Sequence, residues 1–194
     1  MVVSLRKNQI LSGVTVIRYK YNISTRRIAF AGVVAALYAT LTITLSFIGY
    51  GPIQFRVAEA LCILPFYFPI TTWGLFIGCI IANVFSPYPL DIFVGPVASL
   101  IAVLITMQIG KSGPGGVWKK ALACLPPVVV NAVIIGALIA YYMTESFEAG
   151  AFTAAFILNG LQVGLGQAVV MFALGLPAMI YLPKSRVYTK LSEY

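Results

Sequence analysis

The sequence predicts an all-α membrane protein with six transmembrane helices and with both termini in the cytoplasm. The first observation is composition: 60% of the 194 residues are hydrophobic, only 9% are charged, and the mean hydropathy is +0.96. Soluble domains carry about 25% charged residues, so the chain is predicted to be integral to a membrane. Its length allows five or six spans of ~20 residues with short loops and leaves no room for a soluble domain.

The second observation is the distribution of basic residues. When the chain is divided into six spans, twelve of the thirteen lysines and arginines fall before the first span, between the fourth and fifth, and after the last. Cytoplasmic loops carry an excess of Lys and Arg, so only Arg56 is expected outside. Despite a net charge of +8, this pattern argues against a nucleic-acid partner. It predicts a basic cytoplasmic segment over residues 1–27, a membrane domain over 28–182 and a basic tail over 183–194.

The first two apolar stretches predict three of the spans. Ile28–Ile48 is uncharged and long enough to cross a bilayer. Val57–Phe85 is too long for one comfortable span and contains Pro65, so we expect two short helices that meet near Pro69–Thr72. The following Ser86–Pro89, with two prolines, predicts a rigid turn.

Three further spans follow. Asp91–Ile109 begins with a carboxylate, which suits the N-terminal end of a helix dipole. Ala121–Met143 is expected to be broken at Pro126-Pro127, and Gly150–Leu182 forms a long final span. The connecting segment Lys111–Lys120 is rich in glycine but does not match the Walker pattern, so it is predicted to be a loop without nucleotide-binding function.

One polar stretch interrupts the apolar pattern. Tyr50–Leu64 places Gln54, Arg56 and Glu59 between two apolar runs, directly after glycine and proline residues that end the first span. A charge at the centre of a bilayer helix costs ~2.5–3.5 kcal/mol, so such residues usually mark a pathway or a ligand site. We interpret the stretch as one wall of a polar pocket. The alternative is that Arg56 anchors at the membrane interface and Glu59 is its i,i+3 partner.

Other polar and aromatic residues are expected to share this pocket, because the Ser86–Leu90 and Thr144–Ala149 loops face outward with Tyr50–Arg56. Carboxylates accept paired N–H bonds from the edge of a guanine-like ring, amides bond its carbonyl, and aromatic rings stack on its face. The predicted ligand-binding residues are Gln54, Arg56, Glu59, Asn83, Asp91, Asn131, Gln167, Trp73 and Tyr88. The alternatives are that Asp91 caps its helix and that Asn159, a further candidate, only bonds a neighbouring helix.

Several function classes find no support. Histidine, the commonest metal ligand and general base, is absent. Cys62, Cys79 and Cys124 lie inside apolar runs without CxxC spacing and are interpreted as core residues, so neither a disulfide nor a metal site is expected. No catalytic triad or ATPase motif is present, so we expect no enzyme activity and no cofactor.

The first span carries a strip of small residues. Ala31, Ala35 and Ala39 recur every four residues, with Gly32 and Ala36 beside them. Such a strip lets another helix approach closely, so it is interpreted as a docking face for a partner subunit; the alternatives are an internal packing face or simple enrichment in alanine.

Four segments carry a resemblance to a known family: YGPIQFRVAEALCILPF, GLFIGCIIANVF, PPVVVNAVIIG and GLGQAVVMFALGLP. Together they resemble the queuosine-precursor transporter (QueT) family, the substrate-binding S components of energy-coupling factor (ECF) transporters. The resemblance covers about residues 28–182. It implies a six-helix S-component bundle in the bacterial cell membrane that captures a 7-deazaguanine (the cyano or aminomethyl form, or queuine) from outside.

The resemblance also implies partners. Transport would be driven by an ECF module, a transmembrane coupling subunit with two ATPases, docked on Ala31, Ala35 and Ala39. One departure is Gln167, where the family commonly has glutamate; a neutral amide there favours an uncharged ligand. The alternative functions are an S component for another vitamin or purine-like ligand, or a stand-alone channel or facilitator, which would need a continuous polar stripe. An intramembrane enzyme is a third class.

Overall fold

The computed structural model describes residues 24–50, 53–113, 115–145, 149–185 and 188–189, and every regular element within them is helical. Most of the predicted basic segment 1–27 and part of the tail 183–194 therefore lie outside the described residues.

The first predicted span forms two helices. α1 covers Thr25–Thr44, and after a break at Leu45 the short α2 covers Ser46–Gly49. The hydroxyl of Thr42 donates to the carbonyl oxygen of Tyr38 one turn back, at 2.9 Å. A hydroxyl bonded in this way bends a helix, which is consistent with the break that follows.

The second apolar stretch divides close to the predicted point. A 3₁₀ helix, η1, covers Val57–Phe66, and α3 covers Thr71–Asn83. At ~2.0 Å per residue for a 3₁₀ helix and ~1.5 Å for an α-helix, each is about 20 Å long. Both are shorter than the ~30 Å hydrocarbon core of a bilayer.

The remaining helices are longer. α4 covers Asp91–Lys111, α5 covers Val117–Thr144 and α6 covers Ala149–Val170. The expected break at Pro126-Pro127 does not occur, because α5 continues through both prolines, which lie buried against the bundle. The predicted loop over Lys111–Lys120 shortens to residues 112–116.

The final predicted span continues past α6 through a widened turn. A π-helical turn, η2, covers Met171–Gly175, and α7 (Leu176–Tyr181) and η3 (Leu182–Lys184) follow. Pro177 has no N–H, so the Ala173 carbonyl loses its usual donor, and the π turn lies over that residue.

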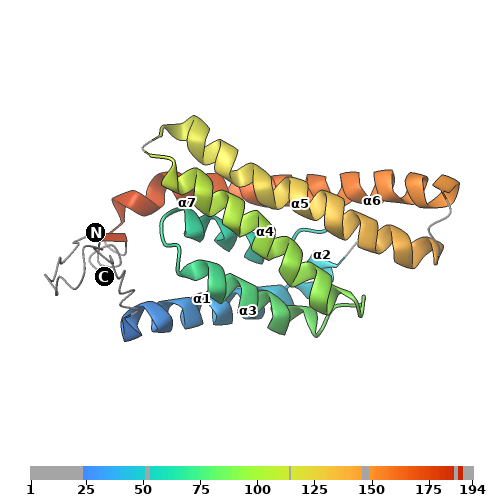
Figure 1. Ribbon diagram of the computed structural model, residues 1–194, viewed down its shortest axis with the longest axis horizontal. Coiled ribbons are helices and arrows are strands. Elements are labelled where there is room, and N and C mark those ends of the chain that lie inside the picture. Colours follow the sequence, from blue (N-terminus) through green and yellow to red (C-terminus); the bar gives the residue numbers. More distant parts are fainter. Residues whose placement is uncertain (1–23, 51–52, 114, 146–148, 186–187, 190–194) are drawn as a thin grey trace, which may run out of the picture.

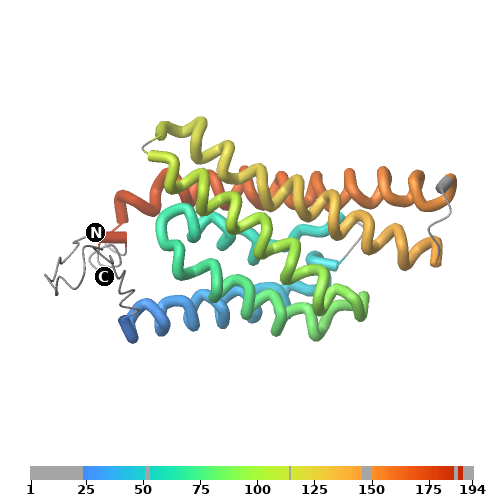
Figure 2. The backbone as a smooth tube through the Cα atoms, in the orientation of Figure 1, coloured from blue at the N-terminus to red at the C-terminus, as the bar shows by residue number. Residues whose placement is uncertain are grey.

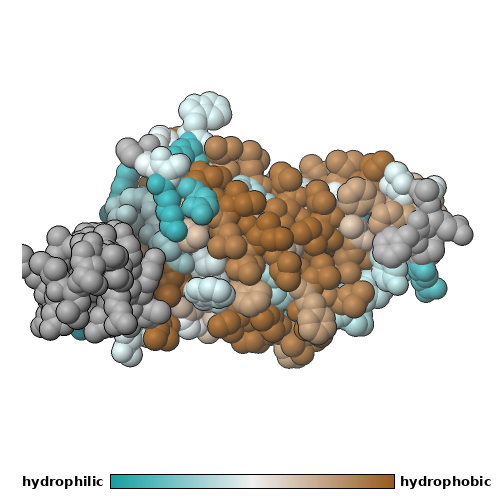
Figure 3. Space-filling view, in the orientation of Figure 1, coloured by the Kyte–Doolittle hydropathy of each residue, from teal (hydrophilic) through white to brown (hydrophobic). Residues whose placement is uncertain are grey.

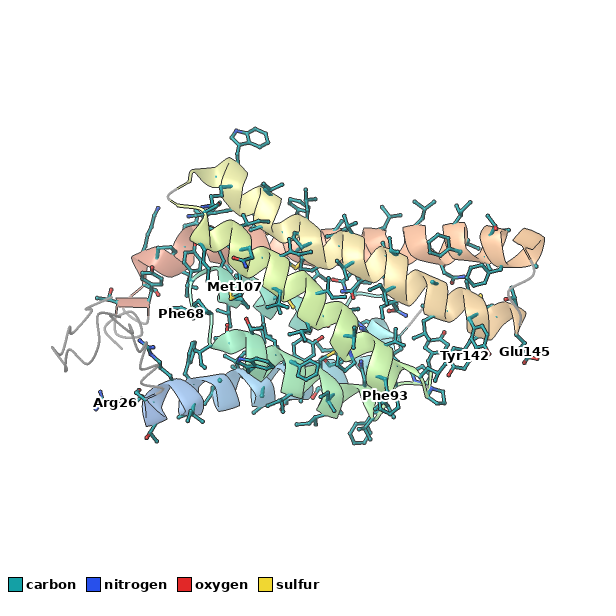
Figure 4. The ribbon with its side chains drawn as sticks, in the orientation of Figure 1. Arg26, Phe68, Phe93, Met107, Tyr142 and Glu145 are labelled. Atoms are coloured by element: carbon teal, nitrogen blue, oxygen red, sulfur yellow. The ribbon has the colours of Figure 1, made fainter. Side chains whose placement is uncertain are left out.

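Successive passes of the chain run in opposite directions along one elongated bundle (Figures 1 and 2). α1, α3 and α5 run one way, whereas η1, α4 and α6 run the other. Arg26 and Glu145 lie at opposite ends (Figure 4). Apolar side chains cover the long side of the bundle seen in Figure 3.

Four helical stretches are long and apolar enough to cross a membrane: Thr25–Thr44, Asp91–Lys111, Val117–Thr144 and Gly150–Lys184. η1 and α3 are apolar but shorter. The described chain is thus a membrane helical bundle with four full-length candidate spans.

Close helix packing in the bundle depends on glycine. A Cβ at Gly74 of α3 would lie 2.3 Å from the Ala31 carbonyl oxygen, and one at Gly78 would lie 2.6 Å from that of Ala35. The same holds between α5 and α6, where a Cβ at Gly136 would lie 2.6 Å from the Gly160 Cα. These pairs of helices pack backbone against backbone, as small residues allow in membranes.

This packing corrects the predicted docking strip. Ala35 and Ala39 are buried and Ala31 is partly buried, with Ala31 and Ala35 directly against the glycines of α3. The strip Ala31, Ala35 and Ala39 is therefore an internal packing face, the alternative that the sequence left open. The exposed small residues of α1 lie one position further along the sequence, at Gly32, Ala36 and Thr40.

Candidate ligand-binding site

Most of the predicted ligand-binding residues are buried inside the bundle. Glu59, Asn131 and Gln167 have no exposed surface, and Gln54, Arg56, Asn83 and Asp91 are at most 4% exposed. Hydrocarbon offers no hydrogen-bond partner, so a buried polar group in a membrane bundle must bond within the protein, to water or to a ligand. The partners of each residue therefore distinguish structural groups from candidate ligand contacts.

Arg56 and Asp91 form a buried ion pair. Nη2 of Arg56, just before η1, donates to Oδ2 of Asp91 at the start of α4 at 3.0 Å, and both side chains are at least 97% buried. The hydroxyl of Ser86 donates to the same Oδ2 at 2.9 Å. Arg56 also lies over the ring of Tyr50, 5.4 Å from its centroid. Asp91 is therefore an ion-pair partner rather than a helix cap, and Arg56 does not pair with Glu59.

Asn83 at the end of α3 connects this pair to its surroundings. Its Nδ2 donates to the backbone oxygen of Asp91 at 3.0 Å, and its Oδ1 accepts from the hydroxyl of Tyr50 at 3.4 Å. A Cβ at Gly95 would lie 2.0 Å from Nδ2 of Asn83, so only glycine at that position leaves room for the amide. Both amide atoms of Asn83 thus have a hydrogen-bond partner within the protein.

Glu59 is the centre of a second polar cluster. Its Oε1 accepts from the hydroxyl of Tyr38 at 2.6 Å and from the hydroxyl of Ser99 at 3.5 Å, and its Oε2 accepts from the thiol of Cys62 at 3.0 Å. The sulfur of Cys79 lies 3.4 Å from the Ser99 hydroxyl. Glu59 therefore joins α1, η1 and α4 and has protein partners on both oxygens.

A different set of buried side chains has atoms without a partner among the described residues. The unpartnered atoms are Gln54 Oε1, Arg56 Nε, Asp91 Oδ1, both amide atoms of Asn131 and both amide atoms of Gln167. Leaving a buried donor or acceptor unmatched costs ~1–3 kcal/mol, so such a concentration is unusual for a structural core. All five residues belong to the set predicted from the sequence.

The short segment before η1 brings these residues together. The backbone oxygen of Gln54 packs against α6, 2.3 Å from where a Cβ of Gly166 would lie, next to Gln167. Two residues along, Arg56 reaches Asp91 on α4. Two residues of chain span at most about 7 Å, so the α4 and α6 groups flank one short segment.

Asn131 lies at the same level of the bundle as Gln167. Ile135 of α5 and Val163 of α6 pack in one buried cluster with Ala98 of α4. Because α5 and α6 run in opposite directions (Figure 2), one turn back along α5 and one turn forward along α6 lead to the same level. One turn from Ile135 is Asn131 and one turn from Val163 is Gln167, and each lies on the same inward face of its helix as the residue it is counted from.

The remaining predicted residues do not join this group. Trp73 is 59% exposed on the outside of α3. Tyr88 is half-buried and packs against Tyr142, with ring centroids 5.3 Å apart. Asn159 is buried but bonded, donating to the Ala155 carbonyl oxygen at 2.8 Å, so it is a structural amide.

The sequence did not identify Tyr38, Ser99 or the role of the cysteines. Tyr38 is a phenol inside an uncharged span and Ser99 is the one serine in α4, and buried hydroxyls require partners. This need for a hydrogen-bond partner was the signal in the sequence that could have identified both residues. Within the described residues, no group of three or more His, Cys, Asp or Glu side chains could hold a metal ion.

A hollow on the bundle is lined by none of these polar groups. Leu90, Val94, Ile134, Leu138 and Tyr141 with Ala137 line an open, apolar depression of about 420 Å³ between α4 and α5. It contains none of the unpartnered atoms, so it is not part of the candidate site.

Comparison with known proteins places the chain in a family. The sequence model described as QueT transporter matches residues 28–184. The chain belongs to the QueT transporter family. Residues of this QueT-family chain are also 43% identical, over 79 residues, to the protein named queuosine precursor transporter QueT of Lactococcus lactis subsp. cremoris (strain MG1363). That alignment covers 40% of this chain and 47% of the relative, so the chain spans about half the length of the relative that it matches. No solved structure matches the chain.

Family membership determines the general class of this protein. A QueT-family chain with several long apolar helices is a multi-pass protein of the bacterial cell membrane. Its buried side chains with unpartnered atoms are then candidates for contact with a ligand.

Proposed function

We propose that the chain is the substrate-binding S component of an ECF-type importer and that it captures a queuosine precursor, a 7-deazaguanine, from outside the cell. The unpartnered polar atoms of Gln54, Arg56, Asp91, Asn131 and Gln167 carry the proposal. They are the groups that a bound ligand would satisfy. The name of the Lactococcus relative supports the ligand class.

The chemistry of these atoms suits a 7-deazaguanine. Such a ring presents N–H groups and an amino group beside a carbonyl oxygen and a ring nitrogen. The free oxygens of Gln54 and Asp91 accept from N–H groups, whereas the free Nε of Arg56 donates to an oxygen or nitrogen. The amides of Asn131 and Gln167 do both. A site built in this way rejects analogues that leave its own groups unpaired.

The proposed topology has six spans with both ends of the chain in the cytoplasm. η1 and α3 would be the second and third spans, tilted or in locally thinned bilayer to compensate for their length. The loop before η1 and the start of α4 would then open towards the outside, next to the Arg56–Asp91 pair.

The proposed partner is an ECF module, a transmembrane coupling subunit with two ATPases. Its docking face on α1 would be the exposed strip Gly32, Ala36 and Thr40, since Ala35 packs against α3 and Ala39 is buried. A Cβ added at Gly32 meets nothing within 4 Å, so a foreign helix has room to approach there.

A binding titration tests the proposal. The purified protein in detergent would be titrated by calorimetry with queuine, the cyano and aminomethyl 7-deazaguanines, guanine and an unrelated vitamin. We expect tight binding of at least one 7-deazaguanine and much weaker binding of guanine and of the vitamin. Tight binding of the vitamin alone would instead favour an S component for another ligand.

Flux measurements separate the proposal from a channel or facilitator. In proteoliposomes containing only this chain, we expect binding but no uptake. Uptake without the ECF module and ATP would contradict the S-component role.

A further inference from the structure

We propose that the candidate site selects an uncharged ligand whose donors and acceptors are balanced, and therefore binds the cyano form of 7-deazaguanine in preference to the cationic aminomethyl form. This inference rests on the proposed function and specifies the ligand of the same site.

The charges among the unpartnered groups cancel. Arg56 and Asp91 are bonded to each other at 3.0 Å, so the negative charge of Asp91 is already matched. Gln54, Asn131 and Gln167 are neutral. A cationic group brought into this buried layer would lose its water without meeting a free counter-charge, and desolvating an unpaired ion is costly.

The hydrogen-bonding capacity of the site is mixed. Its free acceptors are Gln54 Oε1, Asp91 Oδ1, Asn131 Oδ1 and Gln167 Oε1, and its free donors are Arg56 Nε, Asn131 Nδ2 and Gln167 Nε2. Exchanging the O and N atoms of Asn131 and Gln167 would not change this inventory, since both atoms of each amide are free. A ligand must therefore offer acceptors as well as donors.

The two precursor forms differ in what they offer. The cyano form adds a nitrile nitrogen, an acceptor, to a ring that already carries N–H donors. The aminomethyl form adds an ammonium group at pH 7, which only donates and carries a charge. Bound in this site, the aminomethyl form would leave a buried amide donor without an acceptor, and each such mismatch is costly.

No atom of Glu59 is unpartnered, so a ligand cation would have to displace one of its protein hydrogen bonds to pair with it. Both of its oxygens accept from the protein, through Tyr38 on α1, Cys62 on η1 and Ser99 on α4. Cys79 on α3 adds another neutral group, within reach of the hydroxyls of Ser99 and Tyr38. The carboxylate is thus enclosed by donors that the protein itself provides, and none of its atoms is unpartnered.

The test compares the affinities of the two forms by calorimetry at pH 7, with the full chain in detergent. We expect the cyano form to bind at least about tenfold more tightly. Equal affinity, or tighter binding of the aminomethyl form, would overturn the inference while leaving the proposed function intact. If neither form binds, the inference fails, and if queuine does not bind either, the proposed function itself fails.

A charge-changing variant tests the same inference independently. Gln167→Glu adds a carboxylate at a fully buried position, so the ratio of affinities should shift towards the aminomethyl form by at least about tenfold. Asn159→Asp on the same helix is the matched control, because Asn159 is bonded by protein groups. We expect the control to leave the ratio unchanged.

Two results would contradict this assignment. The first is that Gln167→Glu leaves the ratio of the two affinities unchanged, although the variant elutes as a folded species. The second is a wild-type preference for the aminomethyl form that disappears in Glu59→Gln, which would make Glu59 the group that recognises the charge. If Gln167→Glu does not fold, the wild-type ratio alone still decides.

Discussion

The hydroxyl of Tyr38 on α1 donates to Oε1 of Glu59 on η1 at 2.6 Å, and both side chains are at least 99% buried. This bond links the helix whose opposite side presents Gly32 and Ala36 to the carboxylate at the centre of the bundle. A direct polar contact thus links the proposed docking helix to the helix that follows the proposed ligand-binding segment.

Tyr38→Phe removes this donor and leaves the ring in place. Because Glu59 has no exposed surface, we expect the free energy of unfolding to fall by about 1–3 kcal/mol. Thermal unfolding in detergent, followed by circular dichroism, measures the change. Tyr181→Phe, at a ring that is 67% exposed, serves as the control and should unfold like the wild type. Equal melting temperatures for the two variants would contradict the role assigned to the bond.

Breaking the Arg56–Asp91 pair from one side should be more harmful than removing both charges. Asp91→Asn leaves the buried guanidinium without a counter-charge, a loss of about 3–5 kcal/mol. The double variant Arg56→Met with Asp91→Leu should recover much of that stability but should not bind a 7-deazaguanine. Urea or thermal unfolding and calorimetry measure the two properties. A double variant less stable than Asp91→Asn would show that the pair stabilises the fold beyond charge balance.

Replacing an unpartnered amide should separate binding from stability. Asn131→Leu removes two buried polar atoms that no described protein group bonds, so we expect an unchanged or higher melting temperature and at least about tenfold weaker binding. Asn159→Leu, a buried amide with protein partners, should lower the melting temperature and preserve affinity. If both variants lose stability alike, Asn131 is structural.

The docking face can be tested on α1 with two neighbouring alanines. Ala36→Trp places a bulky ring on the exposed side, so purified protein should bind ligand normally while uptake by cells is abolished. Ala35→Trp, against Gly78, should instead disrupt the α1–α3 packing and lower the yield of folded protein. Normal uptake by Ala36→Trp would exclude this face as the docking surface.

Helix positions and the membrane class followed from the sequence because apolar runs and prolines act locally. The division of Val57–Phe85 was predicted correctly, and Pro69 lies in the segment between η1 and α3. The continuity of α5 through Pro126-Pro127 was not, because packing on neighbouring helices compensates for the lost hydrogen bonds.

Pairing of the charged residues could not be predicted in the same way. Arg56 and Asp91 are 35 positions apart, so only the tertiary arrangement brings them together. Arg56 stands before η1 with φ −77° and ψ 82°, outside the helix, so the i,i+3 geometry with Glu59 does not apply. Glu59 instead meets Cys62, three residues on, because side chains at i and i+3 are eclipsed in a 3₁₀ helix.

The sequence did contain a signal for which side of α1 packs inward, but that signal lies in α3 and not in the alanine strip itself. Ala31 and Ala35 are four residues apart, and so are Gly74 and Gly78 in α3. Two strips of small residues with the same spacing can pack against each other, so comparing the two spacings would have favoured internal packing.

As a 3₁₀ helix, η1 is longer than an α-helix with the same number of residues. Rewinding its ten residues as an α-helix would draw its two ends together by about 5 Å, close to one α-helical turn. Gln54 and Arg56 lie just before the N-terminal end of η1, and Ile63 near its C-terminal end packs in one cluster with Met171 of the π turn. A change of hydrogen-bond register within this one short helix would therefore displace Gln54 and Arg56 of the candidate site along the bundle axis, without a tilt of the long helices around them.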